Sequence, residues 1–351
     1  MNSDDLHTLV HAVRGNNNDL IGFIAIHRGN KDHPAFGATR IESYPSIHEA
    51  LYDVLDLAWL MSHKAALADI PYGGGKGVLF DRPELKDSNK RKEILALYAR
   101  AVNTLGGRFV TGSDVGVSQE DVNFMRTHSS HIVGITEDPT KRTAEGLLGS
   151  ITVTLLRLFG EPSLGARSFA IQGVGKVGMA LLDLIGDKTT RVTIADTDGA
   201  RTALAKEKHP HVRVVSPENI LSEDVDILIP CALGGIFNEV SVPTVKAKAI
   251  VGSANNQLAS TEAGDMLYER RILYAPDYVV NAGGLISVVH EFEKEKKADT
   301  QKNLDDAIAA IPIRLAEILN ESKETGVPTH RIADTIARMK IESLYPGHDF
   351  S

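Results

Sequence analysis

The stretch that most constrains the fold is Gly173-Val174-Gly175-Lys176-Val177-Gly178. A strand-like apolar run, Ser168–Gln172, precedes it, and an apolar-periodic helix to about Ile185 follows. A second strand-like run, Arg191–Ala195, ends at Asp196, 18 residues after the last glycine. A bare Gly-x-Gly-x-x-Gly is weak evidence, but with the strand, the helix and the distant acid it is typical of a dinucleotide-binding βαβ unit.

Each part of this unit has a chemical purpose. The glycines allow a tight turn and let a pyrophosphate approach the free N–H groups of the helix N-terminus. A carboxylate at Asp196 can accept hydrogen bonds from the ribose hydroxyls and would repel a 2′-phosphate. We therefore expect NAD rather than NADP, although Arg201 keeps NADP open as an alternative.

Further strand-like runs continue the pattern, at Val212–Val215, Asp226–Ile229, Ala249–Val251 and Ile272–Tyr274. They predict a doubly wound parallel sheet, and we assign residues 143–319 to a Rossmann domain with a first helix capped by Thr143 and running to about Phe159. Ligands of such sheets bind at the carboxyl ends of the strands. The loops containing Cys231, Ala232, Asn255 and Asn281 should therefore face the cofactor. The Cys231 thiol itself we interpret as an inert packing group, because no histidine partner is evident.

The first part of the chain, residues 1–142, predicts a separate α/β domain. Its expected strands are Ile21–His27, Ala35–Arg40, Gly77–Phe80 and Phe109–Thr111. Its expected helices run from Ser46 to about Met61, from Asp87 or Ser88 to Gly106, and onward from Ser118. Two C-terminal helices, Asp305–Asn320 and His330–Met339, should follow, with the segment of about 320–351 packing back on the first domain.

Two lysines lie in an unusual setting in this first domain. Lys64 and Lys76 belong to a nearly uncharged stretch, residues 62–77, with three glycines directly before Lys76. Lysines are rarely buried without a partner, and the glycines let the backbone approach a ligand closely. Asp114 lies at the end of an expected strand, so we interpret it as a candidate proton carrier beside the lysines.

Composition limits the function classes. The chain has 351 residues, enough for two domains, and a net charge of −8, which argues against nucleic acid or an anionic membrane as a partner. One cysteine argues against a disulfide framework, and no apolar run is long enough to span a membrane. We expect a cytoplasmic protein. His128 and His131 lack further ligands at suitable spacing, so no metal site is predicted.

The motifs occur together in one order, namely Lys64, Gly-Gly-Gly-Lys76, Thr-Gly-Ser-Asp114-Val-Gly, the glycine fingerprint, Gly-Ser-Ala-Asn255-Asn and Asn-Ala-Gly-Gly. Over about residues 20–300 the chain resembles the glutamate/leucine/phenylalanine/valine dehydrogenase family. The resemblance implies reversible NAD(P)-dependent oxidative deamination of an L-amino acid to a 2-oxo acid and ammonia. It also implies a substrate and oligomerisation domain before a Rossmann domain, an active site in the cleft between them, and a homo-oligomer.

The resemblance also implies roles for individual residues. Lys64 resembles the lysine that pairs with the substrate α-carboxylate, Lys76 the catalytic lysine and Asp114 the catalytic aspartate. Asn255 resembles the asparagine near the substrate amino group and the nicotinamide, and Thr143 the threonine that contacts the nicotinamide amide.

Physical chemistry supports these roles. Removing hydride from Cα leaves an iminium that water attacks, and the water needs a base. A lysine is a base only as the neutral amine, which the second ammonium of Lys64 and a dry, closed cleft both favour in Lys76. Asp114 can then carry the proton to the departing amine, while domain closure excludes competing water.

Substrate preference follows from the expected side-chain pocket. Glutamate enzymes of the family use a lysine in the piece that here reads Pro34-Ala-Phe36-Gly, and Phe36 offers no cation for a γ-carboxylate. The other pocket positions, Gly112, Leu285 and Val288, are apolar or lack a side chain. Gly112 and Leu285 are similar to phenylalanine-preferring members, so we expect a large apolar substrate, phenylalanine or tryptophan before leucine or valine.

Three alternatives stay open. The first is a leucine/valine dehydrogenase. The second is a non-catalytic NAD-binding sensor, against which the joint presence of Lys64, Lys76 and Asp114 argues. The third is a hydroxyacid dehydrogenase, which would need a histidine–carboxylate pair that does not stand out in the sequence.

Overall fold

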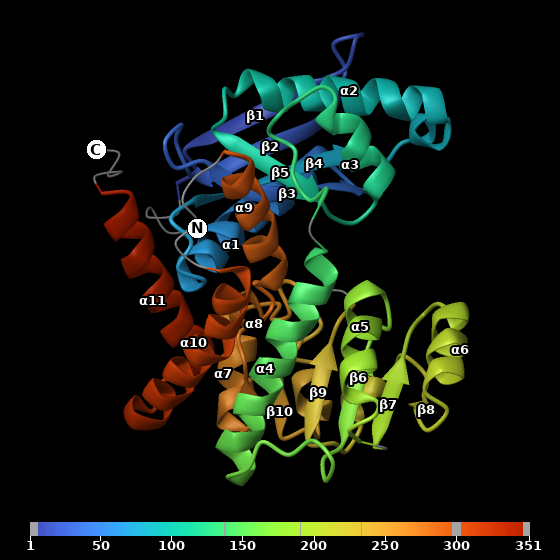
Figure 1. The fold of residues 1–351 in the computed structure, drawn as a ribbon, viewed down its shortest axis with the longest axis vertical. Coiled ribbons are helices and arrows are strands. Elements are labelled where there is room, and N and C mark those ends of the chain that lie inside the picture. Colours follow the sequence, from blue (N-terminus) through green and yellow to red (C-terminus); the bar gives the residue numbers. More distant parts are fainter. Residues whose placement is uncertain (1–5, 137, 190, 233, 297–302, 347–351) are drawn as a thin grey trace. The chain divides into compact units, whose positions relative to one another are not determined.

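The computed structural model describes residues 6–136, 138–189, 191–232, 234–296 and 303–346. It divides into two compact units (Figure 1). The first unit comprises Met1–Glu137, Ser287–Gln301 and Ala337–Ser351, and the second comprises Asp138–Ile286 and Lys302–Ile336. The expected two-domain α/β organisation is confirmed.

The boundaries between the units differ from those expected. The second unit begins with α4, Pro139–Phe159, whose N-cap is Asp138. Thr143 does not cap this helix, because Pro139 occupies its first turn and fixes a helical φ there. The chain returns to the first unit within α9 and again near the middle of α11, rather than at about residue 320.

The first unit contains a mixed five-stranded sheet in the order β1-β2-β4-β3-β5. The strands are β1 Leu9–Arg14, β2 Leu20–Arg28, β3 Ala35–Glu42, β4 Gly73–Phe80 and β5 Phe109–Ser113. Strands β1, β2 and β4 pair antiparallel, whereas β4, β3 and β5 pair parallel. Sequence reasoning missed β1, an edge strand whose side chains alternate only partly between buried and exposed positions.

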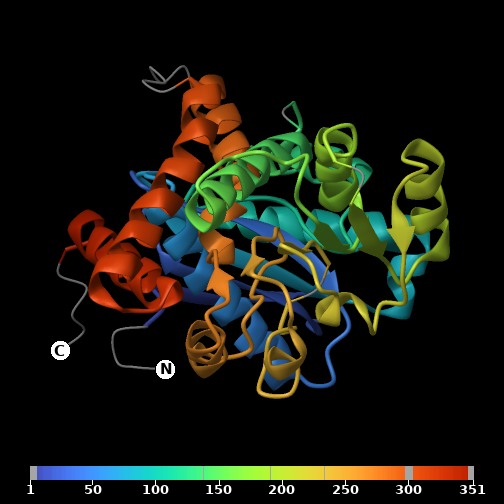
Figure 2. The same cartoon turned by 90° about the horizontal axis from the view of Figure 1, so that it is seen from below.

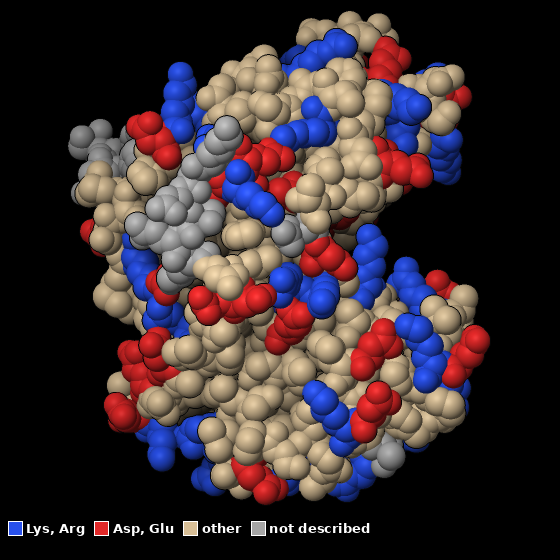
Figure 3. All heavy atoms as spheres, viewed as in Figure 1, with Lys and Arg blue, Asp and Glu red and all other residues tan. Residues whose placement is uncertain are grey.

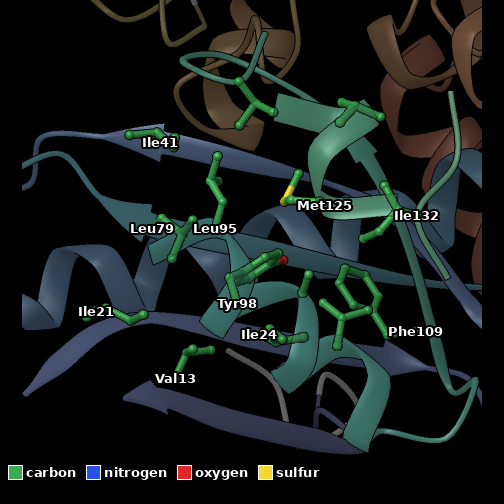
Figure 4. Close-up of a cluster of buried hydrophobic side chains, with 14 of the residues drawn as sticks. Val13, Ile21, Ile24, Ile41, Leu79, Leu95, Tyr98, Phe109, Met125 and Ile132 are labelled. Carbon is green, nitrogen blue, oxygen red and sulfur yellow. The ribbon is translucent and has the colours of Figure 1, made fainter. Parts of the chain in front are cut away.

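Helices cover both faces of this sheet. They are α1 Ile47–Leu67, α2 Ser88–Thr104 and α3 Gln119–Arg126, with a short 3₁₀ turn, η2, at Pro83–Lys86. Helix α1 is capped by Ser46, as expected, but continues beyond Met61 and therefore carries Lys64 in its last turn. Helix α2 packs on the opposite face through a cluster around Leu95, Tyr98 and Phe109 (Figure 4).

The second unit contains a six-stranded parallel sheet in the order β11-β10-β9-β6-β7-β8. The strands are β6 Phe169–Gln172, β7 Val192–Ala195, β8 Arg213–Val214, β9 Ile227–Pro230, β10 Ala249–Ile250 and β11 Leu273–Tyr274. The first strand lies at the centre, and the strand order reverses between β6 and β9. This is the doubly wound dinucleotide-binding order, and the reversal defines the switch point where ligands bind.

The strands of this sheet are apolar and need helices on both faces to exclude water. Figure 2 shows α4 and α5 on one side of the sheet and α7 on the other. Besides α4, the helices are α5 Lys176–Ile185, α6 Gly199–Lys208, α7 Thr261–Glu269, α8 Asp277–Val280, α9 Gly283–Glu295, α10 Leu304–Thr325 and α11 Thr329–Leu344, with 3₁₀ turns η3 Ile220–Ser222 and η4 Val242–Thr244.

The visible surface carries both signs of charge side by side (Figure 3). The chain as a whole has 46 acidic and 38 basic residues. Among the described helices, none is both long enough and apolar enough to cross a bilayer.

Candidate active site

In the first unit a buried lysine and a part-buried aspartate form an ion pair. Lys76, on β4, is only 4% exposed, and its Nζ lies 2.5 Å from Oδ2 of Asp114, directly after β5. The sequence singled out both residues although 38 positions separate them. The pairing follows from the sheet order, since β3 alone lies between their strands and the side chains meet at one edge.

A third charged group, Arg40 on β3, completes this cluster and was missed by sequence reasoning. Its Nε lies 3.3 Å from Oδ2 of Asp114, and its Nη1 lies 3.5 Å from Oδ2 of Asp53 on α1. The hydroxyl of Tyr44 donates to the same Asp53 oxygen at 2.5 Å. Arg40 therefore joins the Lys76–Asp114 pair to a second carboxylate. The available signal was a charged residue at the end of the expected strand Ala35–Arg40.

These charges decide the protonation state of Asp114. Burial raises the pKa of this carboxyl, but the Lys76 ammonium and the Arg40 guanidinium lower it more strongly. The net result is a pKa well below the usual range for aspartate. Asp114 is therefore a carboxylate at neutral pH.

The sequence suggested that the glycines before Lys76 let the backbone approach a ligand. In the structure they instead allow close packing within the protein. They belong to β4, which begins at Gly73 instead of Gly77. A Cβ on Gly74 would lie 2.0 Å from the backbone nitrogen of Ser62. The glycine therefore lets the backbone of α1 lie directly on the strand. Lys64, 7% exposed, lies two residues after Ser62 on α1, and Lys76 lies two residues after Gly74 on β4. The close contact between Ser62 and Gly74 therefore positions the backbone of both lysines.

Two of the expected substrate residues lie on neighbouring strands of this unit. Phe36 on β3 pairs in register with Val110 on β5, and Gly112 lies two residues further along β5. Phe36 is fully buried, with its ring centroid 4.9 Å from that of Tyr72 and 5.1 Å from that of Phe292. Tyr72 and Phe292 were not anticipated, because aromatic residues this far apart in sequence give no local pattern.

The third expected residue of this group, Val288, lies on α9. A Cβ on Gly134 would lie 3.7 Å from Cγ1 of Val288, and a Cβ on Gly112 would lie 3.2 Å from the carbonyl oxygen of Val133. The segment Val133–Gly134 therefore contacts both Gly112 and Val288. Leu285, buried one turn earlier on α9, belongs to the second unit.

In the second unit the glycine fingerprint forms the turn between β6 and α5, as the sequence predicts. Gly173 has φ +89°, and a Cβ there would lie 2.8 Å from Cβ of Ala232. A Cβ on Gly178 would lie 2.0 Å from the carbonyl oxygen of Gly173. Both glycines are thus required by the turn itself.

Gly175 differs from its two partners. It is the N-cap of α5 and makes no side-chain cap, and a Cβ there would meet only Nη1 of Arg201, 3.7 Å away. The space above it is therefore open to a ligand. Beyond it Lys176 and Val177 begin α5, where backbone N–H groups are free of side-chain caps. This cradle fits a dinucleotide pyrophosphate.

Asp196 follows β7 at the position expected for the ribose carboxylate. Its Oδ2 accepts from the backbone nitrogen of Val174, and its Oδ1 accepts from that of Asp198, both at 2.9 Å. Nη1 of Arg201 lies 3.7 Å from Asp196 Oδ2. A carboxylate and an arginine therefore stand together at the place where a ribose 2′-substituent is read.

The loop carrying Asn255 is held by three neighbours. Asn281 Nδ2 donates to Oδ1 of Asn255 at 3.0 Å, and Asp277 Oδ2 accepts from the backbone nitrogen of Asn256 at 2.8 Å. Gln257, fully buried, donates to the carbonyl groups of Gly252 and Ala254. Asn256 has φ +50°, so the loop turns through a left-handed backbone conformation at this residue.

The remaining predicted cofactor residues also lie in the second unit. Thr143 is buried, and its hydroxyl donates to the carbonyl of Pro139 at 2.7 Å. Cys231 directly follows β9 and donates its N–H to Gln172 on β6 at 2.7 Å, which places it and Ala232 at the switch point. Burial raises the pKa of the Cys231 thiol, although Ser253 partly opposes the shift, and this fits an unreactive group. Among the described residues, no group of three potential ligands could hold a metal ion.

A parallel sheet with a glycine turn at its switch point defines a dinucleotide-binding protein of the two-domain α/β class. The sequence profile for the Glu/Leu/Phe/Val dehydrogenase dimerisation domain matches residues 6–131, and that for Glutamate/Leucine/Phenylalanine/Valine dehydrogenase matches residues 200–345. The chain belongs to this family. It is an oxidoreductase that acts on CH–NH₂ groups.

Three relatives indicate its place within the family. L-tryptophan dehydrogenase of Nostoc punctiforme is 38% identical over 96% of this chain and 94% of its own. Phenylalanine dehydrogenase of Bacillus thermotolerans is 36% identical over 92% and 85%, and valine dehydrogenase of Streptomyces coelicolor is 36% identical over 98% and 97%. The crystal structure of the Nostoc punctiforme enzyme superposes with a TM-score of 0.76, at 35% identity and 96% coverage of both chains.

Proposed function

We propose that this protein catalyses the reversible NAD-dependent oxidative deamination of an L-amino acid with a large apolar side chain, phenylalanine or tryptophan before others. The observation that carries the proposal is the ion pair between the buried Lys76 and the part-buried Asp114, next to α1, the helix that carries Lys64. Burying these groups costs several kcal/mol for each ion unless the pairing compensates. A cluster of this kind is typical of a site with a chemical task.

The residues of the first unit supply acid–base chemistry. Lys64 pairs with the substrate α-carboxylate. Lys76 first passes a proton of its ammonium to Asp114, and the resulting amine then takes a proton from the water that attacks the iminium carbon. Asp114 exchanges a proton with Lys76 and with the departing amine, since its Oδ2 lies within hydrogen-bond distance of Lys76 Nζ. Arg40 holds Asp114 in place and in its ionised form.

The residues of the second unit hold the cofactor. The turn at Gly173–Gly178 cradles the pyrophosphate and Asp196 accepts from the ribose hydroxyls. Thr143 and Asn255 orient the carboxamide end, with Asn255 held by Asn281. When bound, the nicotinamide supplies the hydride acceptor for the substrate Cα.

Asp196 favours NAD over NADP in this proposal, because its carboxylate would repel a 2′-phosphate. Arg201 lies close enough to weaken that preference, since a guanidinium can pair with a phosphate. Kinetics with both cofactors decide the point. A kcat/KM for NADP equal to or above that for NAD contradicts the assignment of Asp196.

Side-chain preference rests on Phe36 and Gly112. Phe36 packs on two further aromatic rings and provides no cation, so a substrate γ-carboxylate would be left unpaired. Gly112 lies so close to the Val133 carbonyl oxygen that an added Cβ would be only 3.2 Å from it, so the absence of a side chain lets these two segments pack together. Relatives named for tryptophan and phenylalanine favour an aromatic substrate, while the valine dehydrogenase, at nearly the same identity, supports a branched-chain enzyme as second candidate.

The decisive experiment is a screen of NADH formation across the L-amino acids at alkaline pH, repeated with NADP. The proposal expects the highest kcat/KM with phenylalanine or tryptophan. A higher value with leucine or valine selects the second candidate. Absence of NADH formation with every amino acid, together with retained NAD binding, would identify a non-catalytic NAD-binding sensor.

Gly112→Ala then separates the two enzyme candidates. The added methyl would lie 3.2 Å from the Val133 carbonyl oxygen, and we expect the resulting shift of that segment to narrow the space that we assign to the substrate ring. An aromatic-specific enzyme should lose phenylalanine turnover sharply and keep leucine turnover. Scarcely altered phenylalanine turnover favours the leucine/valine reading. We also propose a homo-oligomer, which the solution mass of the purified protein tests.

A further inference from the structure

A buried carboxylate outside the lysine–aspartate cluster fixes one loop of the first unit. Glu291 lies on the part of α9 that belongs to this unit and is 2% exposed. Its Oε1 accepts from the backbone nitrogens of Gly134 and Ile135, each at 3.0 Å. Its Oε2 accepts from those of Ile135 at 3.1 Å and Thr136 at 3.0 Å. Three consecutive N–H groups therefore converge on one side chain.

The local chain explains why this loop needs a carboxylate. Residues 131–133 run beside β5, where Val133 donates its N–H to Thr111 at 2.9 Å, and this pairing stops at Val133. Gly134 then takes φ +86°, so the next amides turn away from the sheet. Buried N–H groups without a ladder need other acceptors. One carboxylate satisfies all three, because successive amides in a turn form a concave anion site.

The clamped segment lies against two of the residues expected to contact the substrate side chain. The Val133 carbonyl oxygen would lie 3.2 Å from a Cβ on Gly112, and Gly134 lies against Val288. Further contacts hold the same loop from another helix, since Gln119 Nε2 donates to the Gly134 carbonyl at 2.9 Å. Displacing residues 133–134 would therefore change the space beside both Gly112 and Val288.

We infer that Glu291 is a positioning residue for substrate specificity, which acts by clamping the loop Val133–Thr136 against Gly112 and Val288. The inference rests on the proposed function, because it takes Gly112 and Val288 as neighbours of the substrate side chain. Glu291 need not touch the substrate. Its effect is to keep a backbone carbonyl and a glycine in fixed places, so that the enzyme distinguishes between side chains of different shape.

The test is Glu291→Gln, which keeps the shape but replaces one accepting oxygen with a donor. Hydrogen bonds to a charged group are worth about 1.5–3 kcal/mol each, so loss of one should speed amide exchange of Gly134, Ile135 and Thr136 at least about ten-fold. The ratio of kcat/KM for phenylalanine to that for leucine should move toward one by a factor of about three or more, mainly through KM. The KM for NAD should stay within about two-fold of the wild-type value.

Two further variants serve as controls for this test. Glu295→Gln changes a carboxylate one turn along α9 that instead pairs with Arg126, and it should leave the substrate ratio unchanged. Gln119→Ala removes the other contact to Gly134 from an exposed position, so it yields folded protein even where Glu291→Gln does not. It should move the substrate ratio in the same direction by a smaller factor.

The outcomes separate this inference from the proposed function. An unchanged substrate ratio in a variant whose three amides exchange faster overturns the positioning role. Unchanged exchange in Glu291→Gln overturns the clamp itself. Absence of amino acid oxidation by the wild-type protein overturns the proposed function instead, while the exchange measurement still reports on the clamp.

Discussion

The two units build their sites from different materials. In the first unit the functional groups are charged side chains, the buried Lys76 and the part-buried Arg40 and Asp114, positioned by three neighbouring strands of a mixed sheet. In the second unit the main feature is backbone, the turn at Gly173–Gly178 between a central parallel strand and a helix N-terminus. Charged side chains can therefore be brought together from separate strands by the order of the strands in a sheet. A backbone site for a phosphate group instead needs one short contiguous segment.

Glycine illustrates the same contrast. In β4 the glycines allow a helix backbone to lie directly on the strand, and Gly74 has no room for a methyl group beside Ser62. In the nucleotide turn, Gly173 and Gly178 are required by the turn, but Gly175 faces open space. One residue type therefore serves helix packing in the first unit, and both turn geometry and ligand access in the second.

The largest expected effect comes from removing the buried ammonium of the first unit. Lys76→Ala should lower kcat about 10³- to 10⁴-fold, because it deletes the base and leaves Asp114 without its closest cation. NAD binding, which depends on the second unit, should stay within about two-fold in calorimetry. Equal losses of turnover and of NAD binding would contradict the assignment of acid–base chemistry to the first unit and of NAD binding to the second.

The next effect tests the backbone site by comparing two glycines. Gly178→Ala places a methyl 2.0 Å from the Gly173 carbonyl oxygen, so it should destabilise the protein by several kcal/mol and lower Tm clearly. Gly175→Ala meets no such obstacle. It should leave Tm nearly unchanged and raise the KM for NAD by about ten-fold or more, because the methyl occupies the pyrophosphate approach.

Thermal unfolding and NAD titration of the two variants together provide the check. If Gly175→Ala lowers Tm as much as Gly178→Ala, then Gly175 is also a structural glycine, and the cradle we describe is not open.

A smaller effect is expected from Arg40→Met. Burial raises the pKa of Asp114, and without the guanidinium less charge opposes that rise, so the pKa should increase from its lowered value. Asp114 must be ionised to accept a proton. The acidic limb of the kcat profile should therefore move to higher pH, whereas kcat near pH 7, well above that limb, should change by less than about two-fold.

Arg40→Lys provides the matched control for this charge. It keeps a cation near Asp114 and should restore part of the original pH profile. An acidic limb that does not move in Arg40→Met would show that Lys76 alone sets the ionisation of Asp114.

The smallest effect concerns stability of the first unit in acid. His27 is 2% exposed, and burial, with the nearby charge of Arg28, lowers its pKa from 6.5 to about 2. The unfolded chain therefore binds a proton below about pH 6.5 that the folded protein does not bind. Between these two values the free energy of unfolding should fall as pH falls, by at most about 1.4 kcal/mol per pH unit from this group.

Urea unfolding at a series of pH values between 7 and 5 measures this dependence. His27→Leu, similar in size and apolar, should flatten it. A slope unchanged in His27→Leu would assign the acid sensitivity to other groups.

Much of the site could be predicted from the sequence because its signals are local. The fingerprint at Gly173–Gly178 and the acid at Asp196 occupy one βαβ unit, so spacing alone predicts the turn, the helix start and the strand end. Lys64, Lys76 and Asp114 stood out as charges in apolar or glycine-rich surroundings. The expected caps Ser46, Asp87 and Ser118 also begin their helices as predicted.

Other features depended on contacts between distant segments. The strand β4 begins at the glycine run because β2, β3 and α1 hold it there, although glycine disfavours a strand in isolation. Thr143 resembled a cap, but Asp138 and Pro139 begin that helix earlier. The ring of Phe36 packs on Tyr72, from the same segment of the first unit, and on Phe292, from a segment that follows much later in the chain.

The sequence by itself determined the class of fold, the nucleotide turn and the identity of the main ionisable groups. Those properties reside in short segments with their own periodicity and charge. Only the tertiary structure decided that Arg40 joins Asp114 to Asp53, that Gly74 supports α1, and that Glu291 clamps Val133–Thr136. Such contacts arise from sheet order and helix packing, which bring together residues that no local pattern relates.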